Sequence, residues 1–488
     1  MRTSILGGEV AGRGLFGRLD RRSALALGAV VLFAAVLWLD VGGSAGIVSG
    51  LGMVAAGFVV LYPWSKQRSA AELWLRAWRF WLRRRRGLTV FTAGNAAEPA
   101  PPVLGRVEPL ELEGTQHEDM FVLRHSNPGE PSYLSVVMEV DGQPQGLRTE
   151  AQFEAASARY GTMLAQLARD GSFIRGIQQI NRIVPHDPAL HRAFIASRVS
   201  GRPAIQTLVR SYEDLIDLTA NTAEQHRNYL VARFPVTGEF VAAARRYGAG
   251  AIGWAGLVRE ELARFADLVA RADLARPRVL GEQRTCAVLR SIQDPGFPVD
   301  RHEGVRWHNC WLGYRGERGH LAIEGRWLHR VAVVPTDAMA AVPLGSHWLA
   351  PLLVEVNPAV IRTLSVRMEF LPARVARARA VRDVAVDGAS RHNAERRGRV
   401  GDGTDEMMLS ASSRRLADLA PGSGHHGVEW SMAVSVTAAD EGELARACTR
   451  VENAAANCAI GRLEWQDTWH DAAVLAAYPL ARGMAAIR

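Results

Sequence analysis

The chain has 488 residues and a mass of 53.2 kDa, which is enough for two or three domains with substantial cores. Hydrophobic residues make up 48% and charged residues 22%, a composition that excludes a disordered or fibrous chain. Four cysteines, separated by 24, 138 and 10 positions, are too few and too scattered for a disulfide scaffold or a two-CxxC zinc ribbon. Residues 1–87 hold 13 Lys/Arg and 4 Asp/Glu, a net charge of +9, so the remaining 401 residues carry −1. The near-neutral body argues against direct nucleic-acid binding.

Two long uncharged segments lie near the N-terminus. Residues 23–39 contain 17 residues without a charge and residues 41–64 contain 24, with Asp40 between them. A helix needs about 20 apolar residues to cross the hydrocarbon core of a bilayer. We therefore expect a two-helix transmembrane hairpin over residues 23–64. A buried core helix and a cleaved signal peptide are the alternatives for the first segment.

The basic residues flank this hairpin on both sides, and the short turn between the two segments has none. They include Arg2, Arg13, Arg18, Arg21 and Arg22 before it and Lys66, Arg68, Arg76 and Arg79 after it. The positive-inside rule places the side rich in Lys and Arg in the cytoplasm. It predicts a multi-pass protein of the inner (plasma) membrane with a cytoplasmic basic tail, residues 1–22, and with both termini in the cytoplasm. Free thiols are expected in that reducing compartment.

The second apolar segment contains Gly42, Gly46 and Gly50, two overlapping GxxxG units. Small residues four apart let helix backbones approach closely in lipid, so these three are candidate helix-packing residues and leave a homo-oligomer open. The alternative is that glycine is simply common in membrane helices and at turns.

Residues 65–107 begin with a tryptophan-arginine segment and end in a Pro-rich linker. Indole rings favour the headgroup region, and basic side chains there are attracted to anionic lipid. We predict a juxtamembrane helix on the cytoplasmic leaflet, rather than an Arg-rich nucleic-acid arm. The candidate membrane-interface residues are Trp64, Trp74, Trp78, Trp81, Arg83, Arg84, Arg85 and Arg86.

The body alternates between strand and helix periodicity. Strands are predicted at 133–140, 174–184, 364–370 and 430–436. Helices are predicted after the capping pair Thr149 and Gln152, around 257–272, over about 373–399, and after Asp440. This order predicts an α+β body of two ferredoxin-like lobes, residues 108–300 and 301–488.

No convergent catalytic, cofactor or metal site emerges from the motifs. Lys66 is the only lysine, which excludes a Walker A site and a pyridoxal-phosphate Schiff base in the body. His302 and His308 are six residues apart, a spacing that puts them on different sides of a helix. A strand-borne metal site between His302 and His329 stays open, but the spacings fit no familiar ligand set. Cys448 and Cys458 are expected in a helical core. We predict no enzyme activity and no cofactor.

The end of the chain carries a family resemblance. Its pattern consists of Gly461-Arg462-Leu463, Gln466, Asp471-Ala472-Ala473 and Pro479-Leu480. Leu164–Arg169 with Pro185, and Leu289-Arg290 with Asp294-Pro295, add to it. The chain resembles an actinobacterial family of PrgI-like membrane proteins of conjugation or type IV secretion, with a body similar to the N-terminal, non-ATPase part of CagE/TrbE-type traffic ATPases. Val474 and Tyr478 depart from the family pattern.

The resemblance implies a structural component of a transfer apparatus. Its partners would be a separate ATPase docked on the cytoplasmic side and other membrane components. The candidate docking region is the C-terminal part, around residues 360–488, with Trp465 and Trp469; burial in the core is the alternative for these two side chains. The alternatives are a type VII secretion membrane component and a membrane-anchored enzyme such as a lipid-linked glycosyltransferase.

Overall fold

The computed structural model describes residues 21–482 except 66–67, 95–99, 113–115, 142–148, 170, 186–188, 199–202, 301–303, 341 and 397–403. Most of the predicted basic tail and His302 therefore lie outside the described residues. The chain divides into two compact units, a small one that ends at Val90 and a large one, the body, that begins at Phe91. The bounding strand is β3 (Val90–Phe91).

The small unit is mainly helical. It consists of α1 (Arg21–Val41), α2 (Gly43–Leu61), the short paired strands β1 (Pro63–Ser65) and β2 (Arg68–Ser69), and α3 (Ala70–Arg85). Gly42 separates α1 from α2 with a positive φ of 65°, a conformation that glycine adopts without strain.

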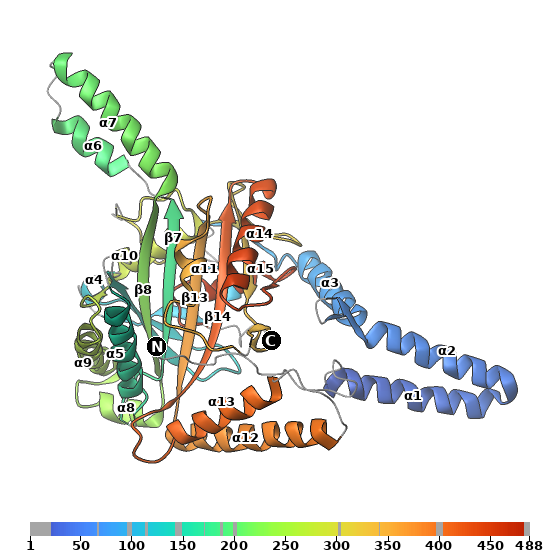
Figure 1. Ribbon diagram of the computed structural model, residues 1–488. Coiled ribbons are helices and arrows are strands. Elements are labelled where there is room, and N and C mark those ends of the chain that lie inside the picture. Colours follow the sequence, from blue (N-terminus) through green and yellow to red (C-terminus); the bar gives the residue numbers. More distant parts are fainter. Residues whose placement is uncertain are drawn as a thin grey trace. The chain divides into compact units, whose positions relative to one another are not determined.

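The body mixes helices with one large antiparallel sheet, the α+β class predicted from the sequence (Figure 1). Its first half runs through β4 (Val107–Pro109), β5 (Val122–His125), β6 (Tyr133–Val140), α5 (Glu150–Leu167), β7 (Gly176–Pro185), α6 (Ala189–Arg198), α7 (Pro203–Thr222), β8 (Glu224–Pro235), α8 (Gly238–Ala244), α9 (Gly250–Arg271) and β9 (Arg278–Val279). Short helices η2 (Pro102–Leu104) and α4 (Gln116–Asp119) flank β4.

The second half repeats this succession of elements. It runs through β10 (Tyr314–Gly316), β11 (Leu321–Ile323), β12 (Trp327–Val333), α11 (Ala350–Val354), β13 (Ile361–Leu371), α12 (Ala373–Arg396), α13 (Thr404–Asp418), β14 (Gly427–Ala438), α14 (Glu441–Asn457) and β15 (Glu464–Trp465). The segment α10 (Glu282–Gln293) connects the halves, and η3 (Thr336–Ala338), α15 (His470–Ala473) and η4 (Val474–Ala476) complete the described elements.

The two halves also pair their strands in the same order. From the centre outwards the first half reads β7-β8-β6, and β6 then pairs with both β5 and β9. The second half reads β13-β14-β12, and β12 pairs with both β11 and β15. In each half a pair of helices is inserted between the two central strands, α6–α7 in the first and α12–α13 in the second. The sequence contains a duplication of topology without a visible sequence repeat.

The halves meet where β7 pairs with β13, from Gly176↔Glu369 to Ile183↔Arg362. Because this pairing is antiparallel, the two helical insertions leave from opposite ends of the sheet, as Figure 1 shows. The two halves of the body are therefore joined edge to edge in one compact unit.

The two faces of the sheet are covered differently. On one face each half has its own apolar core, beneath α5 and α9 in the first half and beneath α11 and α14 in the second. On the other face a single core spans both halves and includes α10, Trp311 and the C-terminal residues Ala473–Ala481. Polar and charged side chains facing this second core must find partners inside it.

Gln178, on β7, fastens the C-terminal segment to this second face. Its side-chain NH₂ donates to Ser365 Oγ at 2.9 Å and to the carbonyl oxygens of Ala476 and Tyr478 at 3.0 Å each. Its Oε1 accepts from the Ala481 N–H at 2.7 Å. One fully buried amide thus links strands from both halves to the end of the chain.

Several local predictions hold. Strand β6 has the predicted bounds, and α5 begins with a complete capping box in which the Thr149 N–H donates to Gln152 Oε1 at 2.9 Å. Asp440 caps α14 through the Glu443 N–H at 2.8 Å. Cys448 and Cys458 are buried on α14 and at its end.

One boundary prediction is wrong. The end of the predicted linker contributes Leu104 and Val107 to the core of the body, because the short helix η2 packs residues 102–104 against it. Trp465, in the candidate docking region, is buried beside Glu452, and Leu480 and Ala481 are buried as well.

We expect Gln178→Met to destabilise the body by about 2–4 kcal/mol, because it leaves buried carbonyl and N–H groups of the C-terminal segment without partners. Urea unfolding of the full chain in detergent, followed by circular dichroism, measures the change.

Gln179→Met is the matched control, since the neighbouring side chain points to the opposite face and accepts a single hydrogen bond, from Tyr160 Oη at 3.0 Å. It should cost about 1 kcal/mol or less. Equal losses in both variants would show that Gln178 does not fasten the C-terminal segment.

Candidate functional site

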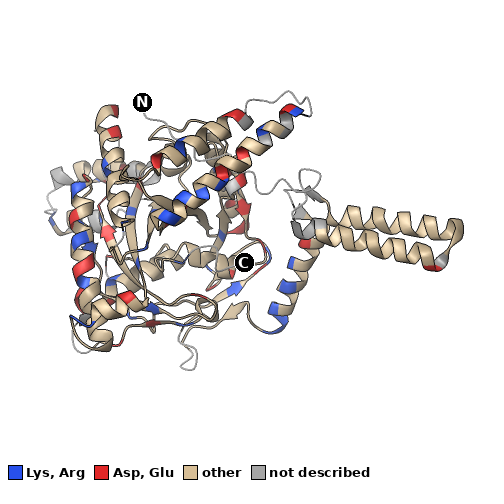
Figure 2. Ribbon diagram, turned by 90° about the horizontal axis from the view of Figure 1, so that it is seen from below, with Lys and Arg blue, Asp and Glu red and all other residues tan. Residues whose placement is uncertain are grey.

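The small unit displays an unusually apolar surface. Among the described residues, most of the large hydrophobic side chains that are exposed belong to residues 25–90. Helix α2 is long and apolar enough to cross a membrane, with a mean hydropathy of 2.0, and it is the one described helix that passes this test. The apolar stretch of α1, Leu25–Asp40, is shorter. Figure 2 shows both helices almost without charged residues. A membrane crossing by both helices thus stays a prediction.

Two of the three predicted helix-packing glycines lie against α1. A Cβ atom on Gly46 would come within 2.9 Å of the Trp38 carbonyl oxygen, and one on Gly50 within 3.3 Å of the Ala34 carbonyl oxygen. Gly57, which the sequence reasoning missed, is equally close to the Val30 side chain, at 2.8 Å. A Cβ atom on Gly42 would meet no atom within 4 Å, because this residue forms the turn between the helices. The packing face of α2 is therefore displaced along the helix from the predicted one.

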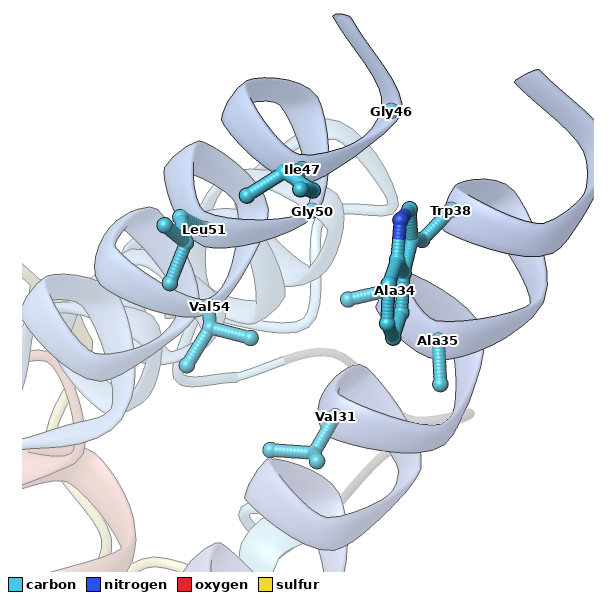
Figure 3. A pocket seen from close by; sticks show the side chains of 9 residues that line it. All are labelled: Val31, Ala34, Ala35, Trp38, Gly46, Ile47, Gly50, Leu51 and Val54. Atoms are coloured by element: carbon cyan, nitrogen blue, oxygen red, sulfur yellow. The ribbon is translucent and has the colours of Figure 1, made fainter. Parts of the chain in front are cut away.

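An apolar groove of about 310 Å³ runs between the two helices (Figure 3). The indole of Trp38 stands on α1 facing the groove, and Ile47, Leu51 and Val54 line the α2 side. No charged side chain lines the groove, so it suits hydrocarbon and offers no chemistry for a polar ligand.

Helix α3 carries the predicted interface residues. Ser69 caps it by accepting a hydrogen bond from the Glu72 N–H at 3.2 Å. Trp74 and Trp78 stack with their ring centroids 6.3 Å apart, and the Arg85 guanidinium lies 3.9 Å from the centre of the Trp81 ring. Arg83, Arg84 and Arg85 form the last turn, where positive charge complements the helix dipole. Trp64 lies in β1, and its side chain is outside the described residues.

Several charged side chains in the body make structural contacts. Arg362, 1% exposed, forms a two-pronged ion pair with Glu224 at 2.5 and 2.8 Å. Its remaining donors reach the carbonyl oxygens of Leu352, Leu353 and Val360. Since Glu224 belongs to the first half and Arg362 to the second, this pair joins them at one end of the β7–β13 junction. Breaking such a buried pair costs about 3–5 kcal/mol.

A second ionic network joins the first half to the segment before β10. Arg227 and Arg284 both bind Asp300, at 2.6 and 3.0 Å, and Arg284 also binds Glu139 at 2.9 Å. The hydrogen bond from Arg227 lowers the pKa of Asp300 to about 2, against the opposing effect of partial burial. The network keeps its carboxylates ionised, which suits structural cohesion rather than proton transfer.

Arg182 and His329 are buried at the second face of the sheet. Arg182 donates to Thr363 Oγ1 at 2.9 Å and to the Ser291 carbonyl oxygen at 3.2 Å, and burial lowers its pKa to about 10. Burial, together with the charge of Arg182, lowers the pKa of His329 to about 3. His329 contacts the Gln293 carbonyl oxygen and Thr437 at 2.9 and 3.0 Å. Within the described part of the chain no three potential ligands form a metal cluster, and His302 lies outside it.

Cys286 and Cys310 form a thiol pair that the sequence reasoning missed. The hydrogen bond with Cys310 and burial both raise the pKa of the Cys286 thiol. Next to this pair, α10 is hydrogen-bonded to the segment before β10. The Gln293 side chain donates to the Cys310 carbonyl oxygen and accepts from the Leu312 N–H. A separation of 24 positions in the sequence gave no signal of this contact.

The residues that carry the family resemblance are largely structural. Arg462 pairs with Asp337 at 3.1 Å, Leu463 and Leu480 are buried, and the Gln466 N–H donates to the Val331 carbonyl oxygen at 2.9 Å. They hold the C-terminal segment to the sheet. No known protein family matches the sequence, and no curated protein matches it either.

We expect Gly46→Leu to push α1 and α2 apart, because the new side chain meets the Trp38 backbone at less than van der Waals distance. Nitroxide labels at Leu25 and Val59, attached through introduced cysteines, report the separation by electron spin resonance in nanodiscs. The four native cysteines are buried and should not react.

Gly52→Leu is the matched control on the same helix, since a Cβ there meets no atom within 4 Å. It should leave the distance distribution unchanged. If Gly46→Leu also left it unchanged, close packing of the two helices would be disproved.

Proposed function

We propose that this protein is a membrane-anchored scaffold whose cytoplasmic body binds other proteins. The exposed apolar surface of α2 carries this proposal, because burying it in lipid is the simplest way to remove it from water. Helix α1 would cross the bilayer beside it, and the close contacts at Gly46, Gly50 and Gly57 would hold the two spans together.

The distribution of basic residues supports an orientation with the body and both termini in the cytoplasm. Helix α3 follows α2 and contains five arginines and one glutamate, and Arg86 comes directly after it. By contrast, Asp40 is the only charged residue at the turn between α1 and α2. This arrangement suits a multi-pass protein of the plasma membrane.

Each half of the body is proposed to be a ferredoxin-like lobe. The order β6-α5-β7-β8-α9-β9, with β9 next to β6 and β8 between β6 and β7, is the expected βαββαβ arrangement. The order β12-α11-β13-β14-α14-β15 supports the same assignment for the second half.

The apparatus is proposed to be of the conjugation or type IV secretion kind, with a separate ATPase docked on the body. The resemblance of the chain's C-terminal pattern to that family supports the class. The structural use of Arg362, Glu224, Arg182 and His329 supports a body that works by contact.

The membrane anchor is tested by Val48→Arg combined with Leu51→Arg, two exposed positions in the middle of α2. Each arginine at the centre of a spanning helix costs about 2.5–3.5 kcal/mol, so the chain should shift from the carbonate-resistant membrane pellet to the extract.

The matched control is Val381→Arg combined with Val386→Arg, two apolar positions on α12 in the body that are also more than half exposed. This variant should stay in the pellet. A wild-type chain that is extracted by carbonate would refute the anchor.

Docking of an ATPase is tested by purifying the tagged full chain in mild detergent from its own cells. We expect a P-loop ATPase to co-purify at near-stoichiometric amount, and ATP hydrolysis to leave with that partner when high salt separates the two. ATP turnover that stays with the isolated chain, or a complex without any P-loop protein, would contradict the proposal.

A further inference from the structure

We propose that α3 lies on the anionic leaflet next to the spans, with its tryptophan face among the phospholipid headgroups. This inference rests on the membrane anchorage proposed above and adds the chemistry of the surface that α3 recognises. The surface that α3 would bind is a bilayer that contains acidic phospholipids.

The tryptophan face is a geometric feature of α3. At 3.6 residues per turn, Trp74, Trp78 and Trp81 fall within an arc of about 60°. Their exposed fractions are 68%, 45% and 45%, whereas Phe80 on another side of the helix is buried at 9%. The face is therefore open along two turns of the helix. Three indoles on one open face are typical of a helix at the boundary between lipid and water.

The charges on this helix match an anionic surface. Arg79, Arg85 and Arg86 are exposed, and Arg85 lies over the Trp81 ring on the same arc as the tryptophans. The only acidic residue of α3, Glu72, is neutralised by Arg76 at 3.0 Å. A guanidinium beside an indole can bind a phosphate oxygen while the ring remains in the apolar layer.

Continuity with α2 favours lipid over nucleic acid or protein as the occupant. Helix α3 begins nine residues after α2 ends at Leu61, so its first turn cannot move far from the bilayer that α2 would occupy. The bases of a single-stranded nucleic acid can also stack on indoles, so the tryptophans alone do not decide between the two. The short connection to α2 does, because it keeps the indoles beside the proposed bilayer.

The test uses the full chain in nanodiscs with an environment-sensitive fluorophore on Trp78→Cys. Thiol labelling is selective because the native cysteines are buried. The comparison position is Arg76→Cys, which carries the same fluorophore on the opposite side of α3. In discs containing phosphatidylglycerol, lipids with a spin-labelled headgroup should quench the fluorophore at position 78 at least about threefold more than the fluorophore at position 76. Discs of phosphatidylcholine alone should weaken the quenching.

The arginines are tested by changing Arg79, Arg85 and Arg86 together to Gln in the labelled Trp78→Cys chain. The control removes the same charge from three exposed positions in the body, by changing Arg374, Arg382 and Arg446 to Gln. Only the changes at Arg79, Arg85 and Arg86 should lower the quenching. High salt should lower the quenching of the unchanged helix in the same way, because it screens the attraction between arginines and anionic lipid.

The outcomes separate this inference from the anchor. A chain that stays in the disc while positions 78 and 76 are quenched equally overturns the proposal for α3 and leaves the anchor intact. Protection of the fluorophore by added DNA, without quenching by lipid, overturns it in favour of a nucleic-acid arm. A chain that does not enter the disc at all refutes both.

Discussion

The antiparallel pairing of β7 with β13 is the constraint on which the body depends. It converts two halves with the same order of elements into one sheet, and it removes the two strand edges that would otherwise be open. Backbone hydrogen bonds alone do not fix which residues face each other. The Arg362–Glu224 pair at one end and the Gln178–Ser365 contact further along are specific side-chain links across the halves, so they favour the observed register.

Joining two halves in this way leaves a wide second face that neither half covers alone. Helices α5, α9 and α14 all belong to the first face, so α10, Trp311 and the C-terminal residues must cover the second. This explains why polar side chains such as Gln178, Arg182 and His329 occur inside it, since they bind the backbone of segments that have no regular partner. The C-terminal residues thus serve to cover this face of the sheet, and Ala473 and Leu480 are fully buried there.

Local structure was readable from the sequence wherever one residue type has one physical role. The capping pair Thr149 and Gln152 specifies the start of α5, and the alternation in Tyr133–Val140 specifies a strand with one face in each core. The order of elements even suggested two similar lobes. The edge-to-edge junction was not readable, because a strand buried on both faces looks the same whichever strand lies beside it. The contact of Cys286 with Cys310, and the inward packing of Leu104, depend on long-range packing that leaves no periodic trace.

At the candidate site, the sequence located the tryptophans and arginines of α3, but it placed the glycine contacts too early. Gly42 has the spacing of a packing residue, yet the turn after α1 needs a residue that tolerates positive φ, and that requirement takes precedence there. The charge of the chain is also distributed unevenly between the N-terminal segment and the body. The excess of positive charge lies in residues 1–87, while the body carries −1, so an anionic membrane would attract the segment around α3 and leave the body without a general pull to the lipid. Under the proposed anchorage, the body would be tethered without adsorbing to the lipid, and its surface would stay accessible for the proposed docking of other proteins.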